Sequence, residues 1–109
     1  MITIKLHDMP KGIYGFTAAD SRTGEYYTLV DSKMCPLQQR HTFGHELAHI
    51  FEGHFHNDAI FHNNDVFFLR VDTIEHEAEQ KAWHYYRMYR DAFRQLQTTG
   101  KTKIEERGL

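Results

Sequence analysis

The sequence has little of several things that mark particular classes of protein. It contains a single cysteine, Cys35, so no disulfide can form within the chain, which favours the reducing cytoplasm. Its net charge of −2 is not the basic balance of proteins that bind nucleic acids or anionic membranes. No apolar run approaches the length that spans a bilayer, and the opening MITIKLHDMP lacks the apolar stretch of a signal peptide. We therefore expect a cytoplasmic protein that binds neither nucleic acids directly nor membranes.

What the chain has in excess is histidine, with nine residues. Histidine is the commonest metal ligand, so a metal site is worth seeking. The 109 residues, 40% hydrophobic and 26% charged, suffice for one globular domain with one modest core. We expect a single domain over residues 1–109, with about 100–109 as a frayed tail.

Hydrophobic alternation predicts a small antiparallel β-sheet in the first thirty residues, and with it an α+β fold. Its three short strands are expected at Ile2–Leu6, Ile13–Thr17 and Glu25–Val30. The last two read as a hairpin, because Ala18–Gly24 between them is a polar loop.

Helical spacing of apolar residues predicts two helices that pack on this sheet. The first follows Pro36 and runs from Leu37 to Phe51. The second is a long C-terminal helix that ends near Thr98. It opens at Asp72, with Glu75 three residues later in the pattern of a capping box. Between the helices, Asp65–Val71 could form a fourth short strand.

The first helix carries the pattern HExxH, as His45-Glu46-Leu47-Ala48-His49. Histidines four apart lie on one helix face, one turn apart, and can both reach a zinc ion about 2.0–2.1 Å away. Glu46 then lies beside the metal, where it can act as general base towards a water molecule. The apolar Leu47 and Ala48 would seat the helix on the core. The pattern predicts a metal site with Glu46 as the catalytic residue.

A catalytic zinc needs a third protein ligand and an open position. Spacing favours Glu75. Glu79, one helical turn later, is its expected supporting partner outside the ligand set, and Glu77 is the alternative third ligand. The competing interpretation of Glu75 is a helix cap that needs no metal. For Glu77 and Glu79 it is a solvated helix face.

Other histidines are candidates for supporting roles. His41 precedes His45 by one helical turn on the same face and could support the metal ligands from outside the ligand set. His54 or His56 could stabilise the oxyanion formed when water attacks a carbonyl. The alternative for both is an ordinary surface histidine.

Two stretches, LQQRHTFGHELAHIFEGH and IEHEAEQKA, resemble the ImmA/IrrE-type metallopeptidases. The resemblance spans about Leu29 to Ala82 and is most specific in the first helix. It implies a minimal zincin fold with a gluzincin-like site, whose zinc ligands are His45, His49 and Glu75. Members of this family are often linked to phages and mobile elements, and some cleave or otherwise inactivate a helix-turn-helix repressor.

We therefore expect a zinc-dependent metalloendopeptidase that hydrolyses a peptide bond in a protein substrate, with one Zn²⁺ per chain. Mn²⁺ is a second candidate metal, since such ligand sets bind several divalent ions. The alternative function is a metal-holding module that sequesters a regulatory protein without cleaving it. A structural domain with a chance motif is a further alternative, and both a monomer and a homodimer remain open.

Overall fold

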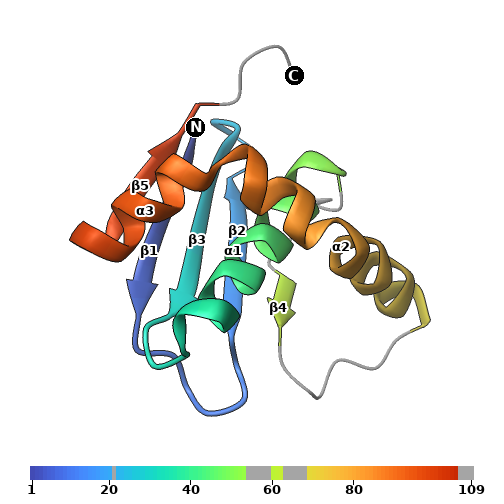
Figure 1. The fold of residues 1–109 in the computed structure, drawn as a ribbon. Helices are drawn as coiled ribbons and strands as arrows, with labels where there is room; N and C mark the ends of the chain where they lie inside the picture. Colours follow the sequence, from blue (N-terminus) through green and yellow to red (C-terminus); the bar gives the residue numbers. More distant parts are fainter. Residues whose placement is uncertain (21, 54–59, 63–68, 106–109) are drawn as a thin grey trace.

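The computed structural model describes residues 1–20, 22–53, 60–62 and 69–105, and Figure 1 shows their arrangement. The elements are β1 (Ile2–His7), β2 (Gly15–Asp20), β3 (Glu25–Asp31), α1 (Pro36–Phe51), β4 (Ile60–His62), α2 (Leu69–Met88), α3 (Arg90–Thr99) and β5 (Lys101–Ile104). The predicted α+β class is confirmed. No helix within the described ranges is both long enough and apolar enough to cross a membrane.

The strands form one mixed sheet in the order β4-β2-β3-β1-β5. The prediction of an antiparallel sheet is wrong at its centre, where β1 and β3 run parallel with Ile2 opposite Tyr26. After β1 the chain first forms β2 and then returns through β3, which lies between them. Alternation in a sequence shows which residues share a face, but it does not show the direction of the neighbouring strand.

The predicted hairpin of β2 and β3 is present and antiparallel, with Gly15 opposite Val30. Its strands are displaced from the prediction, because β2 continues to Asp20, opposite Glu25. The region expected as a polar loop therefore begins with three strand residues, Ala18–Asp20. Pairing with Glu25–Tyr27 of β3 outweighs the weak strand propensity of these small and polar residues.

The frayed C-terminal tail predicted at about 100–109 is wrong for Lys101–Ile104. These residues form β5, antiparallel to β1, with Ile104 opposite Ile2. Gly100, at φ 81°, ends α3 and allows the sharp reversal into the strand. In β5 the buried Thr102 and Ile104 alternate with exposed lysines. This alternation has the period of a strand, but the high charge of the segment hides it in the sequence.

The single long C-terminal helix is also wrong, because Tyr89 (φ −118°, ψ 32°) separates α2 from α3. The apolar stripe continues across this break, so the sequence pattern does not reveal where α2 ends and α3 begins. α2 already includes Leu69, so Asp72 lies inside the helix and is not its cap. The strand expected at Asp65–Val71 is therefore helical from Leu69 onward, and the rest of it lies outside the described residues.

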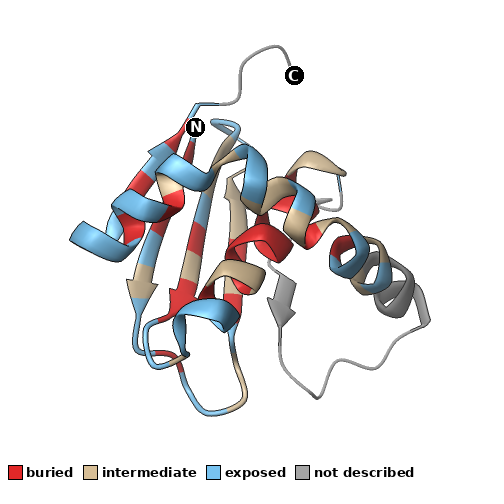
Figure 2. Cartoon of the chain, in the orientation of Figure 1, coloured by how far each residue is buried: buried red, intermediate tan, exposed pale blue. Residues whose placement is uncertain are grey.

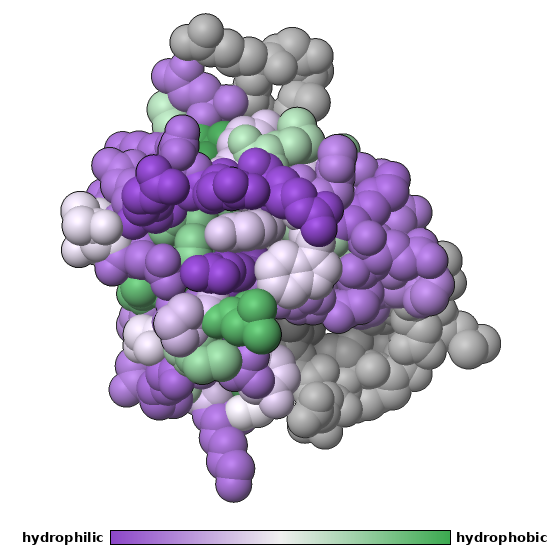
Figure 3. Space-filling model, in the orientation of Figure 1, coloured by the Kyte–Doolittle hydropathy of each residue, from purple (hydrophilic) through white to green (hydrophobic). Residues whose placement is uncertain are grey.

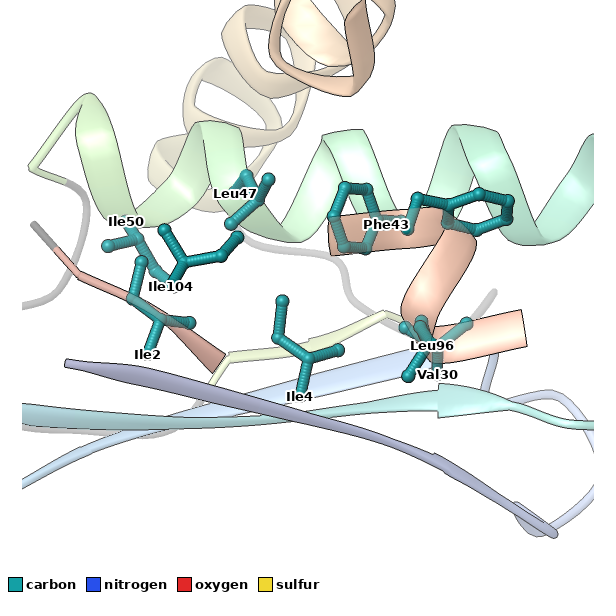
Figure 4. Close-up of a cluster of buried hydrophobic side chains, with 9 residues drawn as sticks. Ile2, Ile4, Val30, Phe43, Leu47, Ile50, Leu96 and Ile104 are labelled. Carbon is teal, nitrogen blue, oxygen red and sulfur yellow. The ribbon is translucent and has the colours of Figure 1, made fainter. Parts of the chain in front are cut away.

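The hydrophobic core lies between α1 and the sheet (Figure 4). Phe43 of α1 packs edge-on against Phe93 of α3, with ring centroids 5.2 Å apart. Figure 2 shows that α1 is the most buried helix, and burial is continuous from Thr42 to Ile50. The sheet covers one side of α1 and α2 packs on another, so His45, Glu46 and His49 are all buried.

Candidate metal centre

The site is built where α1 and α2 pack together at very short range. A Cβ atom at Gly44 would lie 1.9 Å from the carbonyl oxygen of Ala82, a distance that no real contact reaches. Ala78 and Ala82 are fully buried at the same interface. Small residues on both helices therefore let the backbones touch, which brings carboxylates of α2 against histidines of α1.

Three side chains converge at this interface. His45 Nε2 lies 3.1 Å from Glu75 Oε2, and His49 Nε2 lies 2.9 Å from Glu75 Oε1. One atom from each residue lies within 4.8 Å of the other two. Two ligands each about 2.0–2.1 Å from a tetrahedral zinc ion are roughly 3.4 Å apart. The spacing and the donor set of two imidazoles and one carboxylate both fit zinc.

Glu79 bridges His41 and His45 at the edge of this group. Its Oε1 lies 2.9 Å from His41 Nε2, and its Oε2 lies 2.9 Å from His45 Nδ1. His45 thus has a carboxylate at each ring nitrogen, although a neutral imidazole carries only one N–H. When Nδ1 donates to Glu79, the lone pair of Nε2 faces Glu75. That contact is repulsive unless a proton or a metal ion lies between the two atoms.

This arrangement has the form by which proteins orient a metal-binding histidine, with a carboxylate on the nitrogen that does not bind the ion. His41, His45 and Glu79 also form the second group of potential ligands within the described part of the chain. Because the two groups share His45, they are two parts of one site. The sequence predicted Glu79 as a partner of Glu75, whereas in the structure Glu79 contacts His41 and His45.

Glu46 reaches the sheet. Its side chain is fully buried, and Oε1 accepts a hydrogen bond of 2.5 Å from the hydroxyl of Thr17 in β2. Since the single hydroxyl proton of Thr17 is used in this bond, Thr28 in β3 donates to Thr17 across 2.9 Å. Two buried threonines on paired strands, directly opposite each other, therefore hold the carboxylate of Glu46.

Gly15 completes the surroundings of Glu46. A Cβ at this position would lie 2.8 Å from Thr42 Cγ2 and 3.0 Å from Glu46 Oε2. A side chain here would crowd the carboxylate, so glycine keeps the space beside Oε2 clear. No sequence pattern pointed to Gly15, Thr17 or Thr28 as part of the site. The alternation of β2 could have shown that Gly15 and Thr17 share a face, but only the strand register shows what they contact.

Glu77, the alternative third ligand, belongs to neither potential metal group within the described ranges. It acts on the opposite flank. The pKa of Lys81 is raised there chiefly by its hydrogen bond to Glu52, and the charge of Glu77 adds to this effect, as it does for the pKa of Tyr85. There Glu52 accepts hydrogen bonds from Lys81, at 2.6 Å, and from the Tyr85 hydroxyl. The pKa of Tyr85 is raised chiefly by burial and then by Glu52, so this cluster ties the end of α1 to α2.

The remaining candidates, His54 and His56, lie outside the described residues. No protein-family model matches the chain, and no curated protein matches it either. What the chain does therefore has to be inferred from the residues themselves.

Proposed function

We propose that this chain is a zinc-dependent metalloendopeptidase of the ImmA/IrrE type, with one Zn²⁺ held by His45, His49 and Glu75. Its substrate is a peptide bond in a protein, and the family resemblance suggests a phage or mobile-element repressor of the helix-turn-helix class. The α+β architecture is compatible with a minimal gluzincin-like fold, in which a helix carrying HExxH packs between a sheet and a second helix.

One observation carries the proposal. The two histidines of α1 meet the carboxylate of Glu75 from α2 at 2.9–3.1 Å, although the residues are far apart in the sequence. A chance HExxH pattern requires no such partner on another helix. Nor does it require the carboxylate of Glu79 on the second nitrogen of His45, at 2.9 Å. The helix-cap interpretation of Glu75 is weakened, because α2 begins at Leu69 and Glu75 lies in its second turn.

The proposed reaction is hydrolysis assisted by a general base. A bound zinc ion supplies a Lewis acid that polarises the scissile carbonyl and acidifies a water molecule. Glu46 accepts a proton from the attacking water molecule as the water oxygen bonds to the carbonyl carbon. Glu46 then donates this proton to the amine nitrogen as the C–N bond breaks. Thr17 holds Oε1 of Glu46 during both transfers, and Gly15 leaves room at Oε2.

The first test is the zinc content of untagged protein, measured by elemental analysis for four proteins. Wild type is expected to hold about one zinc per chain, while His49→Ala and Glu75→Gln lose it. Glu77→Gln is the matched control, because it makes the same change two residues away on the flank that faces Lys81. If Glu77→Gln lost its zinc while Glu75→Gln kept it, Glu77 would be the third ligand. No zinc in wild type after zinc is supplied would refute the site.

The second test separates catalysis from binding. Glu46→Gln is expected to retain zinc and lose hydrolysis by roughly 10²-fold or more, since general-base catalysis contributes about 10²–10⁴-fold. The assay is cleavage of a mixed peptide library followed by mass spectrometry. If wild type cleaves nothing, and Glu46→Gln still sequesters the partner protein while His45→Ala does not, the chain is the metal-holding module that binds its partner without cutting it.

A further inference from the structure

A pocket of about 330 Å³ opens beside the candidate metal centre, between the N-terminal part of α1 and α2. Its walls include Tyr14, Met34, Leu37, His41, Thr42 and Trp83. In Figure 3, hydrophobic and near-neutral side chains gather over α1 in the middle of an otherwise hydrophilic face. Tyr14 and Leu37 are 43% and 60% exposed, so two large apolar side chains of this wall are open to solvent.

Two contacts connect this pocket to the reacting groups. Thr42 forms part of the pocket wall and also lies beside Glu46. A Cβ atom at Gly15 would lie 2.8 Å from the Thr42 methyl group and 3.0 Å from Glu46 Oε2, so both side chains border the same place. His41 forms another part and lies 2.9 Å from Glu79, which in turn lies 2.9 Å from His45. A side chain bound in the pocket therefore belongs to a residue close to Glu46 and to the proposed zinc ligands.

The chemistry of the wall restricts what it can bind. None of the described residues that form it carries a carboxylate, an ammonium or a guanidinium group. Trp83 and His41 stack obliquely, with ring centroids 5.5 Å apart, and Met34 accepts a weak hydrogen bond from Thr42. An apolar cavity of about 150 Å³ already accommodates a benzene ring. The pocket is therefore large enough for an aromatic or long aliphatic side chain. A charged side chain would exchange its hydration for only the few polar groups of the wall, which are the Gln38 amide, the Tyr14 and Thr42 hydroxyls and the His41 imidazole.

We infer that this pocket binds a large apolar side chain of the peptide substrate, next to the scissile bond, and so selects the cleavage site. The inference rests on the proposed peptidase function and adds a substrate class to it. Bonds beside phenylalanine, leucine or methionine are cleaved, whereas bonds flanked only by small or acidic residues are not. Discrimination by an apolar pocket amounts to roughly 10–200-fold for a single methylene, so phenylalanine over alanine falls at the upper end of that range or above.

The experiment uses hexapeptides that are identical except for phenylalanine, leucine, alanine or aspartate at one central position. Binding is measured on zinc-loaded Glu46→Gln protein through the fluorescence of Trp83, the only tryptophan in the chain. Cleavage is measured on zinc-loaded protein with Glu46 intact. Both measurements are repeated after Leu37→Asp, which adds a carboxylate to the pocket. Met88→Asp is the matched control, because Met88 is 57% exposed and is not part of the pocket wall.

The expected result is that the phenylalanine and leucine peptides bind, change the Trp83 emission and are cleaved. Leu37→Asp then reduces the preference for phenylalanine over alanine by about 10-fold or more, while Met88→Asp leaves it unchanged. Cleavage of all peptides at similar rates would overturn the inference and leave the peptidase proposal standing. Selective binding without cleavage would keep the pocket and refute the peptidase. Absence of any binding preference, or equal effects of the two aspartates, would overturn the pocket's role.

Discussion

Replacing Gly44 by alanine tests whether the contact of α1 with α2 forms the candidate metal centre. In an exposed helix interior this change stabilises a protein by about 1 kcal/mol, because alanine has the higher helix propensity. At Gly44 the new methyl group would meet the Ala82 carbonyl oxygen at 1.9 Å. Since that oxygen belongs to the backbone, no side-chain rotation relieves the clash, and the helices have to move apart.

The size of the movement follows from the same contact. Real Cβ atoms essentially never approach other atoms closer than 3.0 Å, so the helices must separate by at least 1.1 Å, the difference between 3.0 Å and 1.9 Å. His45 follows Gly44 directly, and its 2.9 Å contact with Glu79 and 3.1 Å contact with Glu75 cross the interface that opens. We expect zinc affinity to fall roughly 10–100-fold, as when groups that orient a ligand are lost. Overpacking also costs about 1–3 kcal/mol in stability.

Two measurements check this prediction. Zinc affinity is determined by competition with a chromophoric chelator, and the free energy of unfolding by urea denaturation of the metal-free protein. Gln80→Ala, at an exposed position of α2, is the control for a helical alanine that meets no backbone. If Gly44→Ala were as stable as the parent protein and bound zinc equally well, the close packing of the helices would not be what forms the site.

Two further predictions concern hydrogen bonds to buried carboxylates. Thr17→Val removes the hydrogen-bond donor to Glu46 Oε1. Because a hydrogen bond to a charged group contributes about 1.5–3 kcal/mol, we expect kcat to fall roughly 10–100-fold, with KM and zinc content unchanged. An equal loss of zinc would show instead that the threonine is only structural. The second concerns Asp31, where burial opposes ionisation but hydrogen bonds from Lys33 and Met9 outweigh it, so the pKa lies below its ordinary value of 3.8. A pKa lowered by folding stabilises the protein above the unfolded value, and this stabilisation is lost as the pH falls through the folded value. Asp31→Asn should therefore cost about 1–3 kcal/mol at neutral pH. Urea denaturation should show the difference from wild type shrinking as the pH falls below the ordinary value of 3.8; a difference independent of pH would contradict this.

The features that could be predicted are those encoded within a few neighbouring residues. The helix of HExxH was located to within a residue, because Pro36 begins it and its apolar positions have a helical period. The same reasoning placed Glu79 one helical turn after Glu75, and in the structure both carboxylates contact histidines of α1. Spacing of four residues within a helix determines such groupings before any tertiary contact forms.

The features that could not be predicted depend on contacts between distant segments. The parallel pairing of β1 with β3 and the strand β5 are set by which edges remain available in the folded sheet. The break at Tyr89 leaves the apolar stripe intact, since Phe93 still reaches Phe43 after the turn. Thr17 could not be predicted as the hydrogen-bond partner of Glu46 either, because this contact exists only once β2 packs against α1.

Several local preferences are violated at one place in this chain. Gly44 lowers the helix propensity of α1, and His45, Glu46 and His49 carry polar groups into a buried helix. Each violation is matched by a specific partner from another element: the Ala82 backbone, Glu79, Thr17 and Glu75. A purely structural helix would be more stable with apolar residues at these positions. Costly choices that cluster within Gly44–His49, each with a matching partner on another element, are expected of a functional site, and they argue against a chance occurrence of the motif.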